Sequence, residues 1–176
     1  MPTCMPTYSN PTPTNWYKGR VEEFAEQVRS QLGYETGSSL KEMLSSHGAN
    51  ISYTASSFDD HESGSLIARS IDDFDIYLSP NTSVERDNFT LAHELAHLIM
   101  HFDGEGEMRA TRYVTDDPIQ KRAEWEANWF AAAFLMPAAD FKEFYLNSDG
   151  DLKLVADHFN VSISAADVRA RALDLQ

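Results

Sequence analysis

Residues 89–101 read FTLAHELAHLIMH, and this stretch decides how the rest of the chain is interpreted. Apolar residues fill most of its positions, which predicts a helix that is buried on most sides. His93 and His97 stand four residues apart, so both imidazole rings leave the same helix face, about 6 Å apart along the axis. A buried polar stripe needs partners, and a metal ion would supply them.

The order His-Glu-x-x-His on a helix is the arrangement of zinc peptidases. In such a site the two histidines, here His93 and His97, hold the ion. The glutamate, here Glu94, holds a water molecule and accepts its proton. The pattern therefore predicts a zinc-dependent peptidase with Glu94 as the general base. Histidine and carboxylate ligands also accept iron or manganese, so the choice of metal stays open.

A catalytic zinc site takes three protein ligands, so the third has to come from elsewhere in the chain. His101 continues the four-residue spacing but lies about 6 Å further along the axis, beyond the shared ion. The predicted helix over residues 119–136 offers two carboxylates. Glu126 falls at the edge of its apolar stripe, whereas Glu124 falls on a more polar face. Glu126 is therefore the predicted third ligand, and Glu124 is the alternative.

The remaining segments predict an α+β fold. Period-two alternation indicates strands, and Asp72-Asp73 indicates a tight turn between two of them. We expect a small, mostly antiparallel sheet of about three strands packed on the His-Glu-x-x-His helix, with further helices toward the C-terminus, as in a minimal zincin. Helices are predicted over residues 21–32, 39–48, 83–102, 119–136, 151–159 and 164–173, and strands over 51–54, 65–71 and 74–78, with a further short strand within 108–114.

The composition limits the classes of protein to consider. The chain has 176 residues, which fits one domain, and its formal net charge is −14. Such an acidic chain lacks the basic stripe that nucleic acids require, and it disfavours anionic membranes. Cys4 is the single cysteine, and neither a signal peptide nor a membrane span is visible, so we expect a cytoplasmic protein. Residues 1–14 hold four of the 7 prolines, which predicts a disordered tail before one metallopeptidase domain at 15–176.

Two further segments make the pattern specific. Residues 124–131 read EWEANWFA, and residues 135–137 read LMP. Together with residues 89–101, they resemble the ImmA/IrrE family of metallopeptidases, whose pattern is Phe-Thr-x-Ala-His-Glu-hydrophobic-Gly-His, then Glu-Ala-Asn-x-Phe-Ala and Leu-Met-Pro. The resemblance runs from about residue 76 to residue 137. It departs from the family at Ala96, where glycine is frequent, and alanine is the better helix former.

This resemblance implies a zinc site of two histidines and one glutamate, the latter at the Glu126 position. It also implies an intracellular protein substrate, typically a helix-turn-helix repressor or antitoxin, and a gene carried by a phage, another mobile element or a stress-response locus. Some members carry their own N-terminal DNA-binding domain, and this chain resembles a stand-alone member without one. The alternative from another class is a metal-bound toxin or regulatory module that acts by binding rather than by cleavage.

Other residues have weaker claims to a role. Tyr113, Arg112 and His101 are candidates for stabilising the oxyanion of the reaction. His101 could also support the ligands from behind or contact substrate, and packing is its favoured role. Asn128 could orient a ligand or lie at the surface. The pattern of residues 152–171 resembles a helix-turn-helix. These residues carry few cations, so we expect them to pack as a helical hairpin and expect no direct contact with nucleic acid.

Overall fold

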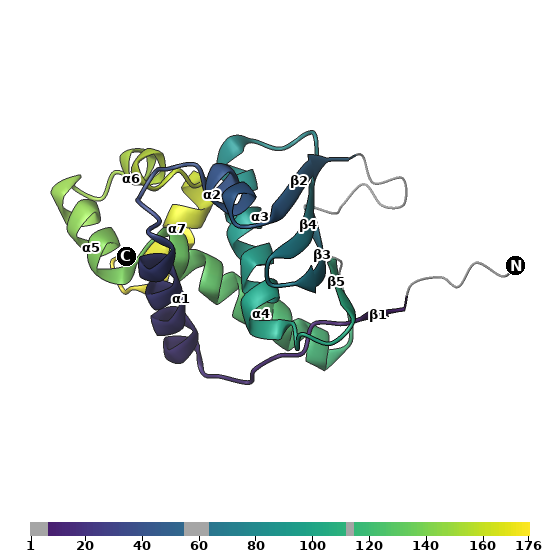
Figure 1. The fold of residues 1–176 in the computed structure, drawn as a ribbon. Coiled ribbons are helices and arrows are strands. Elements are labelled where there is room, and N and C mark those ends of the chain that lie inside the picture. The colour runs from purple at the N-terminus through teal and green to yellow at the C-terminus, as the bar shows by residue number, and fades with distance from the viewer. Residues whose placement is uncertain (1–6, 55–63, 112–114) are drawn as a thin grey trace, which may run out of the picture.

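The computed structural model describes residues 7–54, 64–111 and 115–176 (Figure 1). It combines one five-stranded sheet with seven α-helices and one π-helical turn within those residues. The strands are β1 (Tyr8–Ser9), β2 (Ala49–Tyr53), β3 (Gly64–Ser70), β4 (Asp73–Leu78) and β5 (Glu107–Thr111). The helices are α1 (Lys18–Leu32), α2 (Leu40–Ser46), α3 (Val84–Ala96), α4 (Pro118–Leu135), α5 (Ala138–Asn147), α6 (Leu152–Phe159) and α7 (Ile163–Ala172), and the π-helical turn is η1 (His97–His101).

The sheet is mixed, with strand order β1-β5-β3-β4-β2. β3 pairs antiparallel with both β4 and β5, whereas the β1–β5 and β2–β4 pairs are parallel. This corrects the prediction of a small, mostly antiparallel sheet of about three strands. The β3–β4 hairpin was predictable because its turn is local. The strands of a parallel pair come from distant parts of the chain, so no local sequence pattern predicts that they pair.

The N-terminal segment also differs from its prediction. Tyr8 and Ser9 pair with Glu107 and Met108 of β5, and Pro11 is buried. Residues 8–14 are therefore held against the fold rather than forming a disordered tail, and residues 1–6 lie outside the described part. The segment has few apolar side chains. Backbone hydrogen bonds hold it, and composition does not reveal these.

Helix ends follow the residues that favour them. α1 ends at Gly33, which takes the left-handed conformation with φ of 65°. The Ser39 side chain accepts a hydrogen bond at the start of α2, and Ser83 does the same for α3. α4 begins with Asp117 as the cap and Pro118 in its first turn. The predicted starts of the two helices that carry the site, at residues 83 and 119, lie within one residue of the observed starts.

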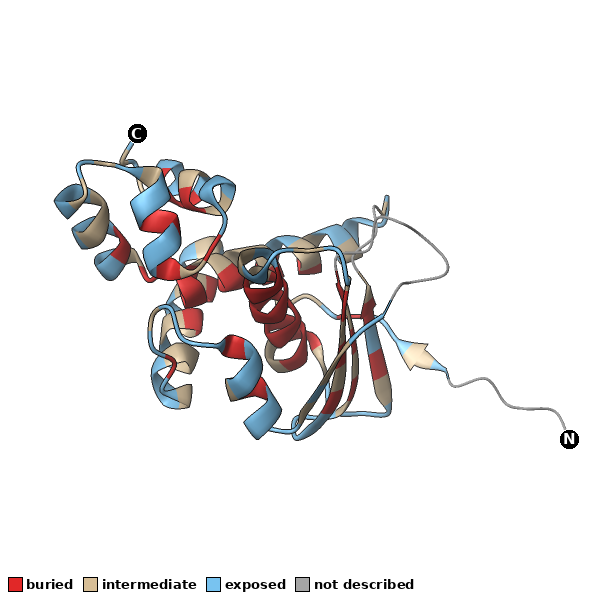
Figure 2. Cartoon of the chain, turned by 90° about the horizontal axis from the view of Figure 1, so that it is seen from above, coloured by how far each residue is buried: buried red, intermediate tan, exposed pale blue. Residues whose placement is uncertain are grey.

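The core lies between the sheet and the helices. Alternate residues of β3 and β4 are buried, and α3 packs between this face and α4, with α1 on the other side of α4 (Figures 1 and 2). α5, α6 and α7 gather at the end of the molecule away from the sheet (Figure 1). Among the described residues, no helix is long and apolar enough to cross a membrane.

Gly48, just before β2, gives a test of this topology. Its φ is 96°, and a Cβ atom there would overlap the carbonyl oxygen of Asp72 in the β3–β4 turn. We expect Gly48→Ala to lower the free energy of unfolding by roughly 2–4 kcal/mol, measured by urea denaturation. Gly33→Ala is the control, because φ is also positive there but nothing lies within 4 Å; about 1 kcal/mol is expected. Equal losses in the two variants would contradict the close β2–turn contact.

Candidate metal centre

Three side chains, one each from α3, η1 and α4, converge on one point. His93 lies in α3, His97 opens η1 directly after it, and Glu124 lies in α4. His93 Nε2 and His97 Nε2 are 3.1 Å apart, and they lie 3.2 and 3.1 Å from the two carboxylate oxygens of Glu124. This group could hold a metal ion.

The geometry and chemistry of this group suit zinc. Tetrahedral zinc with bonds of about 2.0–2.2 Å places neighbouring ligand atoms about 3.3–3.6 Å apart, a few tenths of an ångström more than the separations of these atoms. Two imidazoles and one carboxylate are also a ligand set of catalytic zinc sites, in which one position stays open. Both histidines are fully buried, whereas 24% of the Glu124 side chain is exposed.

Glu126, the predicted third ligand, does not join this group. Its fully buried carboxylate accepts hydrogen bonds from Thr14, Asn15, Arg122 and His101 instead. The helical-face argument correctly identified Glu126 as the buried carboxylate of α4, but the N-terminal segment buries it. Residues two apart on a helix point about 200° apart, so only one of the two glutamates can face both motif histidines. The structure places Glu124 there.

The outer nitrogens of both motif histidines have partners. His93 Nδ1 lies 3.0 Å from Asn128 Oδ1, and His97 Nδ1 lies 2.9 Å from His101 Nδ1. Asn128 is one helical turn beyond Glu124, on the same face of α4. Each Nε2 atom is thereby directed toward the shared centre. His101 lies behind the group rather than in it, as its position along the axis predicted.

The helix changes its hydrogen-bonding pattern inside the motif. α3 is α-helical through Ala96, and η1 continues it as a π-helical turn from His97 to His101. Single π-helical turns are frequent at functional sites. The sequence predicted one continuous helix over residues 83–102, because apolar spacing does not distinguish an α-turn from a π-turn.

Glu94 faces the start of β3. Its side chain is buried, and a Cβ atom at Gly64 would lie 3.3 Å from Glu94 Oε1 and would overlap the Thr90 methyl group. Glycine at position 64 therefore permits the strand to approach the helix beside the predicted base. Sequence reasoning missed Gly64, because nothing local marks a close approach between distant segments. Tyr113 and Arg112, the other oxyanion candidates, lie outside the described residues.

Charge within the site favours a cation. Burial opposes ionisation of Glu124, but hydrogen bonds and charge from the motif histidines outweigh it and hold the pKa of its carboxyl group well below the ordinary value. Burial likewise opposes ionisation of Glu126, yet hydrogen bonds from His101 and other neighbours lower its pKa to about 2. The pKa of His101 is lowered, chiefly by burial. Two ionised carboxylates thus flank buried imidazoles.

Comparison with known proteins agrees with this site. A peptidase family described as the IrrE N-terminal-like domain matches residues 51–171, which is more than half of the chain. The chain therefore belongs to this family, which confirms the resemblance found in its sequence and points to a metallopeptidase. No curated protein is significantly similar to it in sequence.

A solved structure shares the fold. It is described as a Mycobacterium tuberculosis transcriptional regulator, is 16% identical to this chain and superposes with a TM-score of 0.60. The match covers 84% of this chain and 45% of the regulator, so this chain spans less than half of that protein's length. At this level of identity the likeness shows a common fold.

Replacing Glu124 tests the group directly. Glu124→Ala removes one of three converging ligands, so we expect zinc affinity to fall by more than the roughly 100-fold that outer partners of ligands are worth. The measurement is chelator competition on metal-depleted protein. Glu143→Ala, which removes an exposed carboxylate on α5, should leave the affinity unchanged. Wild-type affinity in Glu124→Ala would exclude Glu124 as a ligand.

Proposed function

We propose that this chain is a zinc-dependent endopeptidase that cleaves an intracellular regulatory protein. The observation that carries the proposal is the convergence of His93, His97 and Glu124 next to Glu94, in a chain that belongs to a peptidase family. His93, His97 and Glu124 would hold the ion. A bound zinc ion supplies Lewis-acid chemistry, which activates water and polarises a carbonyl group.

The chain's own residues supply the proton transfers. Glu94 directly follows His93 in α3, so its carboxylate belongs to the same turn as a ligand and is placed to accept the proton of the attacking water. The oxygen of that water adds to the carbonyl carbon of the scissile peptide. Glu94 then delivers the proton to the amine nitrogen, which leaves as the peptide bond breaks. Atoms and charge balance without a further reactant.

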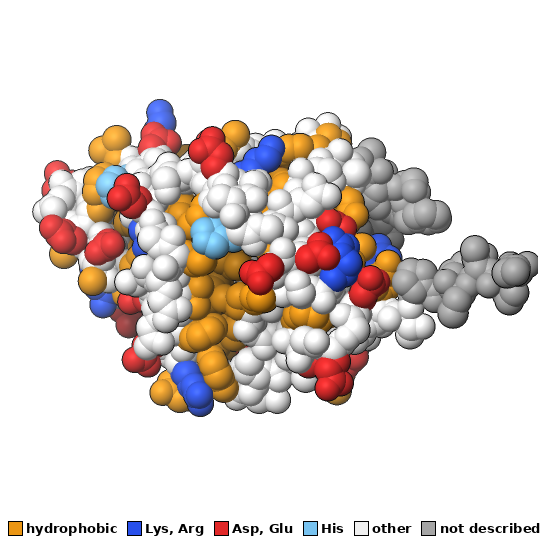
Figure 3. Space-filling model, viewed as in Figure 1, with side chains coloured by type: hydrophobic (Ala, Val, Ile, Leu, Met, Phe, Trp, Pro, Cys, Tyr) orange, Lys and Arg blue, Asp and Glu red, His pale blue; other side chains and the backbone are white. Residues whose placement is uncertain are grey.

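A helix-turn-helix repressor or antitoxin is the proposed substrate. The family resemblance supports this class, and the charge of the chain is compatible with it. Acidic side chains are scattered over the face shown in Figure 3, and the net charge is −14. Such a surface repels nucleic acid but attracts a basic DNA-binding protein at the encounter stage. The substrate would therefore be bound as protein, away from its DNA.

Glu94→Gln tests the proposed mechanism. The amide keeps the shape of the side chain but cannot accept a proton, so we expect zinc binding to persist while cleavage falls by at least about 100-fold. The readout is the integrity of helix-turn-helix repressors co-expressed with either protein, together with the zinc content of the purified chain.

Two outcomes would overturn the proposal. Cleavage at the wild-type rate by Glu94→Gln would remove the general base. Capture of an intact repressor by wild-type protein loaded with zinc would support the alternative, a regulatory module that acts by binding. Wild-type protein treated with a chelator is the control, because it keeps Glu94 but lacks the ion.

A further inference from the structure

Glu126 and His101 form a second layer behind one side of the metal centre. We propose that they are positioning residues, which hold His97 with its Nε2 lone pair toward the ion. The N-terminal segment contributes by fixing the Glu126 carboxylate. The inference rests on the proposed metal site. It assigns a purpose to a buried carboxylate that the ligand group does not use.

The contacts form one continuous line of hydrogen bonds. Glu126 Oε2 lies 3.0 Å from His101 Nε2, and His101 Nδ1 lies 2.9 Å from His97 Nδ1. His97 Nε2 then faces Glu124 and His93 at 3.1 Å from each. The side chains of this line other than Glu124 are all buried: Glu126, His101, His97 and His93. In this geometry the donor and acceptor roles at one imidazole determine those at the next.

The direction of each hydrogen bond follows from the ion. A metal on His97 Nε2 requires a lone pair there, so the proton of that ring sits on Nδ1. His97 Nδ1 must then donate, and His101 Nδ1 must accept. His101 consequently carries its proton on Nε2 and donates it to Glu126. With the ion bound, one tautomer of each ring satisfies the whole line, and the Glu126 carboxylate at its end accepts the last hydrogen bond.

Glu126 is held by more donors than a simple ion pair needs. Oε1 accepts from Asn15 N at 2.8 Å and from Arg122 Nε at 3.0 Å. Oε2 accepts from Thr14 N and Thr14 Oγ1, both at 2.9 Å, besides His101. Five donors on two oxygens fix the orientation of the carboxylate as well as its charge. A carboxylate that only balanced Arg122 would not need this enclosure.

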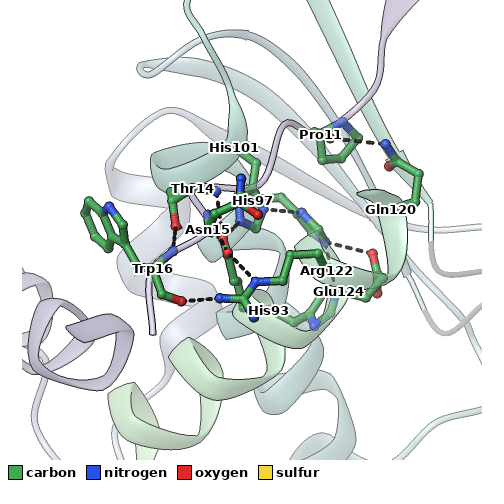
Figure 4. A network of polar contacts seen from close by, with 11 residues as sticks. Pro11, Thr14, Asn15, Trp16, His93, His97, His101, Gln120, Arg122 and Glu124 are labelled. Atoms are coloured by element: carbon green, nitrogen blue, oxygen red, sulfur yellow. Dashed lines mark hydrogen bonds and ion pairs between the residues drawn. The ribbon is translucent and has the colours of Figure 1, made fainter. Parts of the chain in front are cut away.

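Residues 12–16 of the N-terminal segment contact both Glu126 and His101 or their neighbours. Thr14 and Asn15 bind the carboxylate of Glu126, and Thr12 N donates to the backbone carbonyl of His101 at 3.1 Å. The Arg122 guanidinium also binds the carbonyl oxygen of Trp16. Figure 4 shows the segment passing beside His101 and Arg122. A stretch more than 70 residues before the motif thus completes its second layer.

The Nδ1 atoms of the two motif histidines contact different kinds of side chain. His93 rests on Asn128, a neutral amide, whereas His97 is connected through His101 to an anion. Hydrogen bonding to a carboxylate raises the basicity of a ligand imidazole, and outer partners of this kind are typically worth 10–100-fold in metal affinity. The carboxylate at the end of the line should therefore strengthen His97 as a ligand.

Glu126→Leu and His101→Phe test the relay on the full chain. Leucine removes the acceptor at the end of the line, and phenylalanine keeps a ring but removes both nitrogens. We expect zinc affinity, measured by chelator competition, to fall about 10–100-fold. In zinc-loaded protein, ¹⁵N NMR of the His101 ring should show the Nε2–H tautomer in the wild type and a mixture of tautomers in Glu126→Leu. A role in stability alone would not move that signature.

Asn88→Ala is the matched control. Asn88 is a buried residue of α3 whose side chain donates to Asn160 O at 3.1 Å, outside the relay. Its replacement should lower stability yet leave zinc affinity and the His101 tautomer unchanged. Unchanged zinc affinity in folded Glu126→Leu and His101→Phe, with an unchanged His101 tautomer in Glu126→Leu, would overturn the inference. That result leaves the proposed function intact, whereas a wild-type chain that binds no zinc would overturn both.

A milder variant covers the case in which the buried replacements do not fold. Thr14→Val keeps the shape of the side chain but removes the hydroxyl donor to Glu126 Oε2. It lies in the N-terminal segment, outside every helix. We expect a several-fold loss of zinc affinity with little change in the unfolding midpoint, and unchanged affinity would contradict a working role for the segment.

Discussion

The packing of α3 against α4 is the constraint on which the site depends. α3 brings its histidines to one line, but a line of imidazoles on one helix cannot enclose an ion. α4 supplies the missing oxygen from Glu124 and the backing amide from Asn128, one turn apart on a single face. The sheet on one side and α1 on the other hold the two helices at this distance.

Two faces of α4 contact different parts of the site because of the helical period. Glu124 and Asn128 face the motif histidines, while Arg122 and Glu126, also one turn apart, face the N-terminal segment. The two faces differ by about 200°, the rotation between residues two apart. His101 joins them, since it contacts His97 on one side and Glu126 on the other. Both glutamates of the EWEAN segment are thus used, in different layers of the same centre.

The sequence was informative wherever the chemistry is local. The spacing of His93 and His97, the start of α3 and the β3–β4 turn are each set by neighbouring residues, and the structure has them close to their predicted places. Periodicity also showed that Glu126 is the more buried of the two glutamates. It could not show what buries Glu126, because the N-terminal segment reaches it from 112 residues away through hydrogen bonds. The parallel strands escaped prediction for the same reason.

Burial and metal ligation are therefore separate properties of a carboxylate. A fully buried acid needs donors, but protein amides, an arginine and a histidine satisfy Glu126 as well as a metal would. A catalytic metal site keeps one coordination position open to substrate, so a partly exposed carboxylate can border that opening while buried histidines complete the site. Glu124 has that exposure, with 24% of its side chain accessible. In a helix that carries two inward acids, the less buried one is the better candidate for the metal, and the more buried one for the support behind it.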